Sequence, residues 1–471
     1  MDELTWTAAW KIRQLIEARE VSCSEVTEHF LARIEKFNPT LHAFAEVDTE
    51  GARAQAARAD AAVTAGDELG PLHGIPTAVK SHIRVEGMLH TQFAQSVVST
   101  FDDVSVERLR GAGAVIVGTN TMMGAGATAP TDRDNPGVFS PFNWDAEARS
   151  PWDTDRVPGW SSSGGAAATA AGLLPFVLGS DGGGSTRLPG AYSGVVGLHT
   201  TRGLVPHLDY EKPTMMLTAS YGPLARDVRD SAIVTSVIGG PDGRDYVCLQ
   251  DDTPDCVATL DRGVEGMCLG WTDDFGFASR YAGEESERVI TLVREAAQGL
   301  SSLGAVVAPT DEAWEDRGKH GTLRWTVEPS AYEVMVGTNA TPLQPVDPDL
   351  YRAQAESRAR NWEHFREYFR DHDVIMSATS QLVAKTIPAW EAAWTTDGPS
   401  FPGGSFAPAY CSHTMIFNWL GFPAVSVPCG FVDGMPVGLQ IAAWPGREDV
   451  VLRVANAFQQ AFPRLERPPV S

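Results

Sequence analysis

Three consecutive glycines, Gly182 to Gly184, follow an apolar run and directly precede Ser185 in the stretch LLPFVLGSDGGGSTRLPG. The apolar run is typical of a short buried strand, and the residues after Ser185 could open a helix. Glycine loses more conformational freedom on folding than other residues, so a triplet is expected where the backbone must approach another group closely. The amides of such a loop can bind a phosphate, or they can stabilise an oxyanion beside a nucleophilic serine. A plain tight turn between a strand and a helix fits this stretch equally well.

Other glycine-rich motifs do not fit this loop. A P-loop requires a lysine before its Ser or Thr, and Gly184 is followed directly by Ser185. The glycine spacing also differs from the dinucleotide-binding pattern GxGxxG. Arg187 stands where the α/β-hydrolase elbow GxSxG would have its last glycine. A nucleophilic Ser185 would therefore need a base from elsewhere in the chain.

One lysine stands at the end of an apolar run, IPTAVK, in a chain that contains few lysines. Burial lowers the pKa of a lysine, so a buried Lys80 could act as a neutral base. A lysine at a strand end can also simply extend its ammonium group to solvent. A second stretch, GWSSSGGAAATAAG, places Ser161, Ser162 and Ser163 before an alanine-rich helix. Lysine can serve as the base for a nucleophilic serine, so these residues form a candidate catalytic set.

Composition argues against several classes of protein. The chain has 471 residues, 43% hydrophobic and 21% charged, as a globular enzyme does. Its net charge of −23 argues against nucleic-acid binding, which needs a basic surface. We find no apolar run long enough for a membrane span, and the N-terminal stretch lacks the pattern of a signal peptide. The six cysteines show no metal-ligand spacing, so we expect reduced thiols in a cytoplasmic protein.

The order of the predicted elements favours an α/β fold, a mixed sheet covered by helices. Residues 264–309 suggest a strand, a helix and a strand, and 421–444 suggest two strands joined by a turn at Asp433 and Gly434. Residues 130–158 are polar and rich in proline, which predicts a long surface loop, and residues 310–400 are predicted to be helical. Further helices are predicted within 1–20, 22–39, 48–66, 106–111, 163–172 and 448–462, with a strand in 114–120.

Four motifs together resemble the amidase signature family of serine amidohydrolases. They are GIPTAVK, GWSSSGGAAA, GSDGGGSTRLPGAYSGVVGL, and GFPAVSVPCG with GMPVGLQ, and they follow the family's order. The resemblance covers most of the chain and implies one large domain, residues 1–471, with a mixed central sheet and helices on both faces. We expect N-terminal helices in 1–65, the catalytic core in 66–240, substrate-side elements in 241–400, and closing strands and a helix in 401–471.

The resemblance also implies a triad of a lysine, a serine that follows a cis peptide bond, and a nucleophilic serine. Lys80 and Ser185 match the lysine and the nucleophile. The family's bridging serine lies 24 residues before the nucleophile, at Ser161 here, and the additional serine in this motif makes Ser162 the second choice. The oxyanion donors would be the amides of Gly182, Gly183, Gly184 and Ser185, and Asp181 and Arg187 would form an ion pair that holds the loop. The chemistry requires no metal or cofactor.

Departures from the family's pattern bear on the substrate. Trp160 replaces a glycine, and TMMGAGATAP follows Asn120 where the family usually has Pro-Glu. If this segment lines the pocket, Met122 and Met123 supply adaptable apolar surface while Ala125 and Gly126 leave room, although plain core packing explains the methionines slightly better. A wide apolar pocket would suit aryl or alkyl amides, and also carbamates, better than a small charged amide.

The first hypothesis is therefore a serine amidohydrolase for small apolar or aryl amides and urethanes, acting as a monomer or homodimer. Aryl acylamidases, nylon-oligomer hydrolases and urethane-cleaving enzymes are the relevant members of the family. The alternative is the amidotransferase subunit that releases ammonia within a tRNA-dependent complex. The acidic composition and the unusual segment after Asn120 argue against that alternative. An inactive binding protein is disfavoured because all three triad residues are present.

Overall fold

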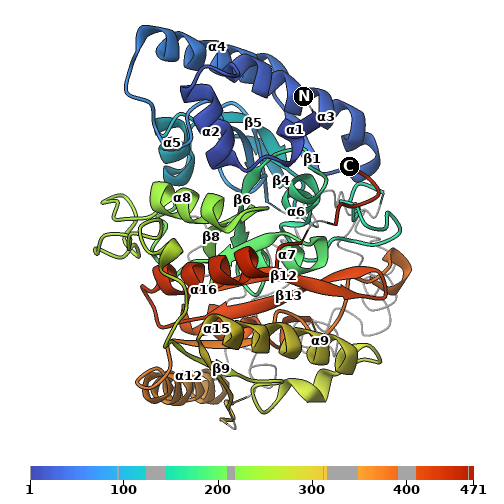
Figure 1. Ribbon diagram of the computed structural model, residues 1–471, viewed down its shortest axis with the longest axis vertical. Helices are drawn as coiled ribbons and strands as arrows, with labels where there is room; N and C mark the ends of the chain where they lie inside the picture. Colours follow the sequence, from blue (N-terminus) through green and yellow to red (C-terminus); the bar gives the residue numbers. More distant parts are fainter. Residues whose placement is uncertain are drawn as a thin grey trace.

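The computed structural model describes residues 2–92, 95–123, 145–208, 218–310, 312–315, 348–390, 410–464 and 466–471. Within them, one mixed sheet of eleven strands extends through the molecule, and helices flank it (Figure 1). The strand order is β1-β5-β2-β6-β8-β7-β12-β13-β11-β9-β10. The fold class is therefore the one expected from the sequence, a single mixed α/β sheet with helical cover. The division at residues 65, 240 and 400 remains a prediction.

The site is positioned by three neighbouring parallel strands. β2 pairs in parallel with β5, where Lys80 lies opposite Asn120, and with β6, where Val79 lies opposite Leu178. The carboxyl ends of the three strands therefore meet at one edge of the sheet, where ligands bind in many α/β folds. The strands of this half of the sheet are β1 (Phe44–Val47), β2 (Pro76–Lys80), β5 (Val115–Asn120), β6 (Phe176–Asp181), β7 (Val196–His199) and β8 (Ser220–Ala225).

The other half of the sheet comes mostly from the C-terminal part of the chain. Its longest strands, β12 (Ala424–Val432) and β13 (Met435–Ala442), form an antiparallel hairpin. Asp433 and Gly434 at the hairpin turn have φ of 52° and 75°, as a two-residue turn of this kind requires. The remaining strands are β9 (Cys268–Trp271), β10 (Val306–Pro309) and β11 (Val374–Ala378), and a separate hairpin consists of β3 (Leu89–Gln92) and β4 (Gln95–Val98).

Two of the helices connect directly to the site, α6 (Ser163–Ala170) and α7 (Arg187–Ser193), and both are buried. α3 (Cys23–Leu41) begins with the capping box that the sequence predicts, in which the Ser22 and Glu25 side chains bond to each other's backbone amides. The other α-helices are α1 (Asp2–Trp6), α2 (Ala9–Glu17), α4 (Thr49–Ala65), α5 (Val104–Gly111), α8 (Val228–Ile238), α9 (Ser286–Gln298), α12 (Pro348–Tyr368), α15 (Met415–Leu420) and α16 (Glu448–Ala461). Single 3-10 turns lie at η2 (Leu260–Arg262), η3 (Ala278–Tyr281) and η4 (Gly299–Leu303).

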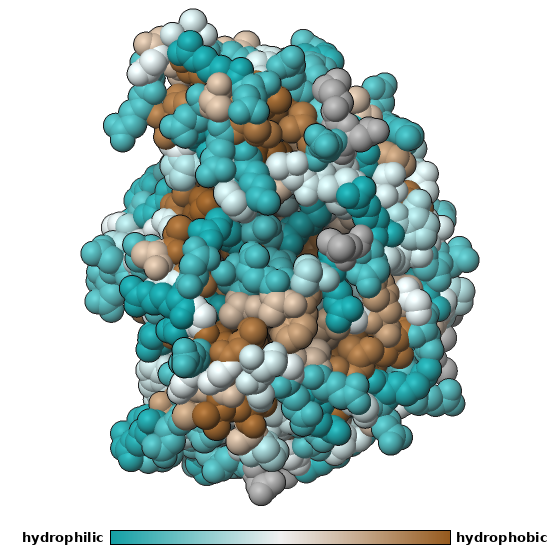
Figure 2. All heavy atoms as spheres, viewed as in Figure 1, coloured by the Kyte–Doolittle hydropathy of each residue, from teal (hydrophilic) through white to brown (hydrophobic). Residues whose placement is uncertain are grey.

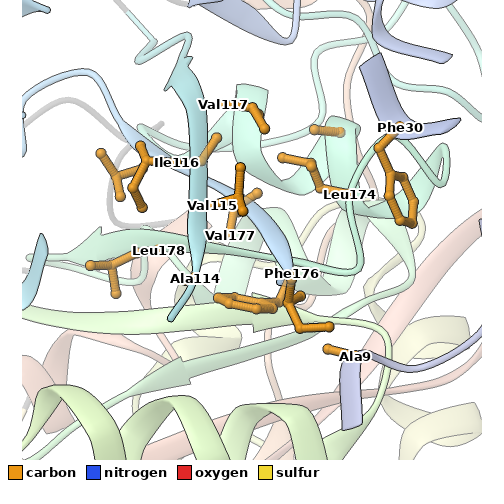
Figure 3. Close-up of a cluster of buried hydrophobic side chains, with 14 of the residues drawn as sticks. Ala9, Phe30, Ala114, Val115, Ile116, Val117, Leu174, Phe176, Val177 and Leu178 are labelled. Atoms are coloured by element: carbon orange, nitrogen blue, oxygen red, sulfur yellow. The ribbon is translucent and has the colours of Figure 1, made fainter. Parts of the chain in front are cut away.

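The central strands are buried on both faces. Every residue of β5 and β6 is buried, so these strands carry continuous apolar runs rather than alternating ones. Figure 3 shows part of this core, with Val115 to Val117 of β5, Phe176 to Leu178 of β6, and Phe30 of α3. Because this core is rigidly packed, it fixes the positions of the polar residues at the strand ends, Lys80 of β2 and Asp181 of β6.

The N-terminal segment forms two helices, not the single helix expected over residues 1–20. α1 ends at Trp6, and α2 begins at Ala9. The carboxylate of Asp230, on α8, accepts hydrogen bonds from the amides of Ala9 and Trp10 at 2.8 and 2.9 Å. This distant side chain caps the first turn of α2. The break therefore depends on a tertiary contact that no local pattern reveals.

The prediction of a long surface loop over 130–158 is confirmed in part for its described residues, 145–158, which form no helix or strand but do not lie only at the surface. Ala148 and Val157 are fully buried. The Val157 amide donates to the carbonyl of Lys385 at 3.2 Å, and Arg156 forms an isolated β-bridge with Thr386. The segment is therefore paired with another part of the chain through its backbone. Residues 130–144 lie outside the described residues.

The region predicted to be helical, 310–400, also contains a strand. β11 is a five-residue buried strand at the centre of the C-terminal half of the sheet. Periodicity cannot separate so short an apolar run from part of a buried helix. α12 supplies the helix expected in this region.

The face of the molecule in Figure 2 carries hydrophobic residues in separate patches among hydrophilic ones. None of the helices in the described ranges has both the length and the apolar character that crossing a membrane requires.

Candidate active site

Lys80 is the last residue of β2 and is buried, with 2% of its surface exposed. Its Nζ donates to Ser161 Oγ at 2.6 Å and to Ser180 Oγ at 3.0 Å. Two hydroxyl groups from different segments thus hold the amine at the carboxyl end of the parallel strands. Lys80 does not extend to solvent, which was the competing interpretation from the sequence.

Burial lowers the pKa of Lys80 to about 7, and the negative charge of Asp181 partly opposes this shift. The cause is the loss of hydration, which penalises the charged ammonium group. A lysine with a pKa near neutral pH is uncharged in a large fraction of molecules and can accept a proton there.

The structure distinguishes between the two candidate bridging serines. Ser161 Oγ accepts the hydrogen bond from Lys80, whereas Ser162 Oγ donates to the carbonyl of Ser180 at 3.0 Å. Ser162 is also the residue that precedes the first turn of α6. Its hydroxyl therefore joins α6 to β6, and the hydroxyl that meets the amine belongs to Ser161.

Ser185 lies in the loop between β6 and α7, and 4% of its surface is exposed. This loop continues from the carboxyl end of β6, beside the end of β2 that carries Lys80. The fold therefore brings the three predicted triad residues to one edge of the sheet. Within the described residues, the hydrogen bond between triad members is the one from Lys80 to Ser161.

Gly184 has a backbone conformation and surroundings that exclude a side chain. Its φ is +124°, and an added Cβ would lie 2.5 Å from Thr414 Oγ1 and 2.7 Å from Leu188 Cδ1. Both the torsion angle and the space therefore require glycine directly before Ser185. The close approach that the glycine triplet predicts is made here to residues of α7 and of the segment before α15.

A buried ion pair between Asp181 and Arg187 holds the loop that joins β6 to α7. Arg187 Nε donates to Asp181 Oδ2 at 3.0 Å and Nη2 donates to Oδ1 at 3.1 Å, with both side chains fully buried. Asp181 also accepts from the Thr186 hydroxyl at 2.8 Å. Burial alone would raise the pKa of Asp181, but the Arg187 guanidinium and the other donors hold it well below its usual range. The carboxylate therefore stays charged and fixes the shape of the loop.

The same carboxylate corrects one expectation about the oxyanion donors. The Gly184 amide donates to Asp181 Oδ1 at 2.6 Å, so it is directed into the ion pair. An amide engaged by a carboxylate is not available to a substrate oxyanion. Gly184 thus shapes the loop, and its amide does not belong to the predicted donor set.

Four supporting residues were not found from the sequence. Ser180 stands beside Asp181 in the recognised motif, so its position could have suggested a contact with the active site. Gln440 likewise ends the recognised motif GMPVGLQ. Thr414 and Asn418 carried no signal, because they lie more than 200 positions further along the chain. Thr414 Oγ1 donates to the Gly183 carbonyl at 2.7 Å, Asn418 Nδ2 donates to Asp181 Oδ1 at 2.8 Å, and Arg187 Nη1 donates to Gln440 Oε1 at 2.8 Å.

The predicted pocket residues fall into two groups. Met122 and Met123 are buried, and the Met123 amide donates to the Ser161 carbonyl at 3.2 Å. Met123 belongs to the same apolar cluster that Trp160 packs against. Ala125 and Gly126 lie outside the described residues. The described part of the segment after Asn120 thus contacts, through its backbone, the loop that carries Ser161, Ser162 and Ser163.

The described residues contain no group of three or more His, Cys, Asp or Glu side chains placed to hold a metal ion.

The similarity of this chain to known proteins extends over nearly its whole length. A family model described as Amidase matches residues 25–318 and 322–452. An acylamidase from Rhodococcus erythropolis is 30% identical, over 99% of this chain and 98% of that protein. A glutamyl-tRNA(Gln) amidotransferase subunit from Prochlorococcus marinus (strain MIT 9313) is 33% identical, over 96% of each chain. The crystal structure of a bacterial aryl acylamidase has a TM-score of 0.81 at 24% identity, over 98% of this chain and 97% of that one, and so shares the fold.

Proposed function

The chain belongs to the amidase family, and from this premise we propose that it hydrolyses apolar or aryl amides through an acyl-enzyme on Ser185. The observation that carries the proposal is the hydrogen bond of 2.6 Å from Lys80 Nζ to Ser161 Oγ. The pKa of about 7 gives Lys80 the protonation state that a base needs.

The first half of the reaction forms the acyl-enzyme. Neutral Lys80 accepts the proton of Ser161, Ser161 accepts the proton of Ser185, and Ser185 Oγ attacks the amide carbon. The resulting oxyanion accepts hydrogen bonds from the amides of Gly182, Gly183 and Ser185. Each donor of this kind stabilises the transition state by about 3 kcal/mol.

The second half releases both products. The proton held by Lys80 returns through Ser161 to the leaving nitrogen, so the amine departs neutral and the C–N bond breaks. Water then attacks the ester on Ser185 and gives its proton to the same relay. The carboxylic acid leaves, and all three residues regain their starting protonation states.

The preference for apolar or aryl groups is supported by the residues beside the serine loop. Trp160 directly precedes Ser161, and its ring lies 5.6 Å from that of Trp390 and 6.2 Å from that of Tyr410. Met123 lies in the same apolar cluster. A carbamate carbonyl has the same geometry as an amide carbonyl, so urethanes form part of the proposed substrate class.

A second candidate function is that of an ammonia-releasing component of an amidotransferase. The similarity to the glutamyl-tRNA(Gln) amidotransferase subunit, at 33% identity, favours it. The two functions differ in what the isolated chain can do. An amidohydrolase for apolar amides turns over anilides without partners, whereas the amidotransferase component is expected to release ammonia from glutamine within its complex.

The experiment is a panel of p-nitroanilide amides and matched p-nitrophenyl carbamates, assayed with the isolated protein. Wild type is compared with Ser185→Ala and Lys80→Ala, and the exposed residues Ser301 and Lys11 provide the controls Ser301→Ala and Lys11→Ala. We expect turnover by wild type and both controls, and its loss in the two site variants. Turnover that survives in Ser185→Ala contradicts the mechanism. An isolated wild-type protein that turns over no anilide or carbamate favours the amidotransferase, whose ammonia release is expected only within its complex.

A further inference from the structure

Trp160 is partly exposed, whereas the aromatic residues that its ring contacts are buried. Trp390 and Tyr410 have 0% and 1% of their surface exposed. Trp160 also directly precedes Ser161, whose hydroxyl meets Lys80 Nζ. A partly exposed tryptophan that is the neighbour of a proposed reacting group is a candidate for contact with the substrate.

The three rings form a compact cluster in which each contacts the other two. Trp160 lies almost parallel to Tyr410, with an interplanar angle of 15°, and is tilted by 36° from Trp390. The rings of Trp390 and Tyr410 are themselves stacked, 4.9 Å apart. Tyr192 of α7 meets Tyr410 edge-on at 5.9 Å, and its hydroxyl donates to Ser380 Oγ at 2.7 Å. The buried rings therefore fix the orientation of Trp160 from one side.

The backbone of Trp160 is fixed as well. Gly159 has a φ of +114°, and a Cβ there would lie 2.8 Å from the Tyr192 ring and 3.0 Å from Pro189 Cα. On the other side, the Met123 amide holds the Ser161 carbonyl. The backbone on either side of Trp160 is therefore held between α7 and the segment after β5. A rigid aromatic surface can bind a flat ring with little loss of conformational freedom.

We propose that Trp160 is a specificity-determining residue that stacks on a planar aromatic ring of the substrate, close to the scissile amide. This inference rests on the proposed function and adds a named contact to it. If Trp160 served packing alone, replacing it with another apolar side chain would affect aromatic and saturated substrates equally. A stacking role instead predicts an effect that depends on the substrate ring.

The test uses two pairs of amides that differ only in whether a six-membered ring is aromatic. Benzamide and cyclohexanecarboxamide place the ring on the acyl side, and acetanilide and N-cyclohexylacetamide place it on the leaving side. For each pair, the ratio of the two kcat/KM values is measured in wild type and in Trp160→Leu. Comparing these ratios between the proteins cancels the intrinsic reactivity of the amides. Trp160→Phe keeps an aromatic face, and Trp362→Leu, at a partly exposed tryptophan on α12, is the matched control.

We expect Trp160→Leu to lower the aromatic preference by about three- to tenfold in one of the pairs, as the loss of one aromatic contact predicts. The affected pair identifies the side of the amide on which the ring binds. Trp160→Phe should retain the preference, and Trp362→Leu should not change it. A burst of p-nitrophenol from p-nitrophenyl acetate counts folded sites in each variant, and Trp160→Met replaces Trp160→Leu if the latter gives no burst.

Two results would overturn the inference in distinguishable ways. An active Trp160→Leu protein with unchanged ratios in both pairs overturns the role of Trp160 and leaves the proposed function intact. A wild-type protein that shows neither a burst nor turnover of any amide overturns both.

Discussion

Lys80 and Ser161 lie on segments 81 positions apart in the chain, yet Lys80 Nζ and Ser161 Oγ are 2.6 Å apart. The contact forms because β2 ends beside β6, and the loop before α6 crosses the same edge of the sheet. A buried amine bonded to a serine hydroxyl is an arrangement suited to proton transfer, since burial favours the neutral amine.

The dependence of activity on pH tests the state of Lys80. Burial lowers the pKa of Lys80 to about 7, so the fraction of neutral amine falls as pH decreases through 7. We expect kcat/KM for an activated anilide to decrease about tenfold per pH unit below that value and to level off above it. The measurement is a pH–rate profile from pH 5 to 9, with circular dichroism to check folding. A flat profile would show that the base titrates elsewhere.

Single alanine substitutions separate the two neighbouring serines. Ser161→Ala removes the hydroxyl that meets Lys80, and we expect kcat to decrease by about 10²- to 10⁴-fold with little change in stability. Ser162→Ala removes the hydrogen bond to the Ser180 carbonyl, and we expect a loss of about 1 kcal/mol in the free energy of unfolding with most activity retained. Kinetics and urea unfolding of both variants provide the readouts. The opposite pattern would make Ser162 the bridging serine.

The requirement for glycine before the nucleophile predicts a strong effect of one methyl group. Gly184→Ala places a Cβ against Thr414 and Leu188 at a φ that only glycine adopts easily. We expect the free energy of unfolding to decrease by about 1–3 kcal/mol, and kcat to decrease because the loop moves. Gly243 has no atom within 4 Å of a built Cβ, so Gly243→Ala is the control. Normal activity and stability in Gly184→Ala would mean that the loop is less constrained than its contacts indicate.

Removing one partner of the buried ion pair tests its structural role. Arg187→Gln leaves the buried carboxylate of Asp181 without its countercharge, and we expect a loss of about 3–5 kcal/mol in the free energy of unfolding. The loss should be smaller at low pH. In wild type, the depressed pKa of Asp181 means that its contribution is present above the unfolded pKa and is lost only as pH falls through the still lower folded pKa. In Arg187→Gln, burial without the countercharge raises the pKa of Asp181, so the carboxyl takes up a proton by pH 4 and the unpaired buried charge disappears. Urea unfolding at pH 7 and pH 4 measures both effects.

An exposed ion pair of similar chemistry provides the control for that experiment. Arg53 pairs with Glu28 at the surface, where about half of each side chain is accessible. We expect Arg53→Gln to leave the free energy of unfolding nearly unchanged, because solvent screens the pair. Equal effects of the two substitutions would contradict a special role for Arg187.

The sequence was most informative where chemistry and local structure coincide. Lys80 at the end of an apolar run, and Ser185 after a glycine triplet, both lie where a strand ends, and the fold places both at one edge of the sheet. Ser161 could not be separated from Ser162 by pattern alone, because the distinction depends on which hydroxyl faces the amine. That direction is set by the turn into α6, which follows from packing against β6.

The sequence was least informative where a contact joins distant segments. Asn418 and Gln440 complete the surroundings of the ion pair from α15 and β13, and no spacing connects them with Asp181. The Gly184 amide was expected in the oxyanion site, but its direction depends on the Asp181 carboxylate. The break between α1 and α2 likewise depends on Asp230. Such tertiary contacts override local patterns.

The most direct test of the central claim is to locate the covalent intermediate. The protein is incubated with a slowly released p-nitrophenyl carbamate, quenched with acid, digested and mapped by mass spectrometry. The account predicts one carbamoyl group on the peptide that contains Ser185, and none on the corresponding peptide of Ser185→Ala. Modification of another residue, or turnover by Ser185→Ala, would contradict the account.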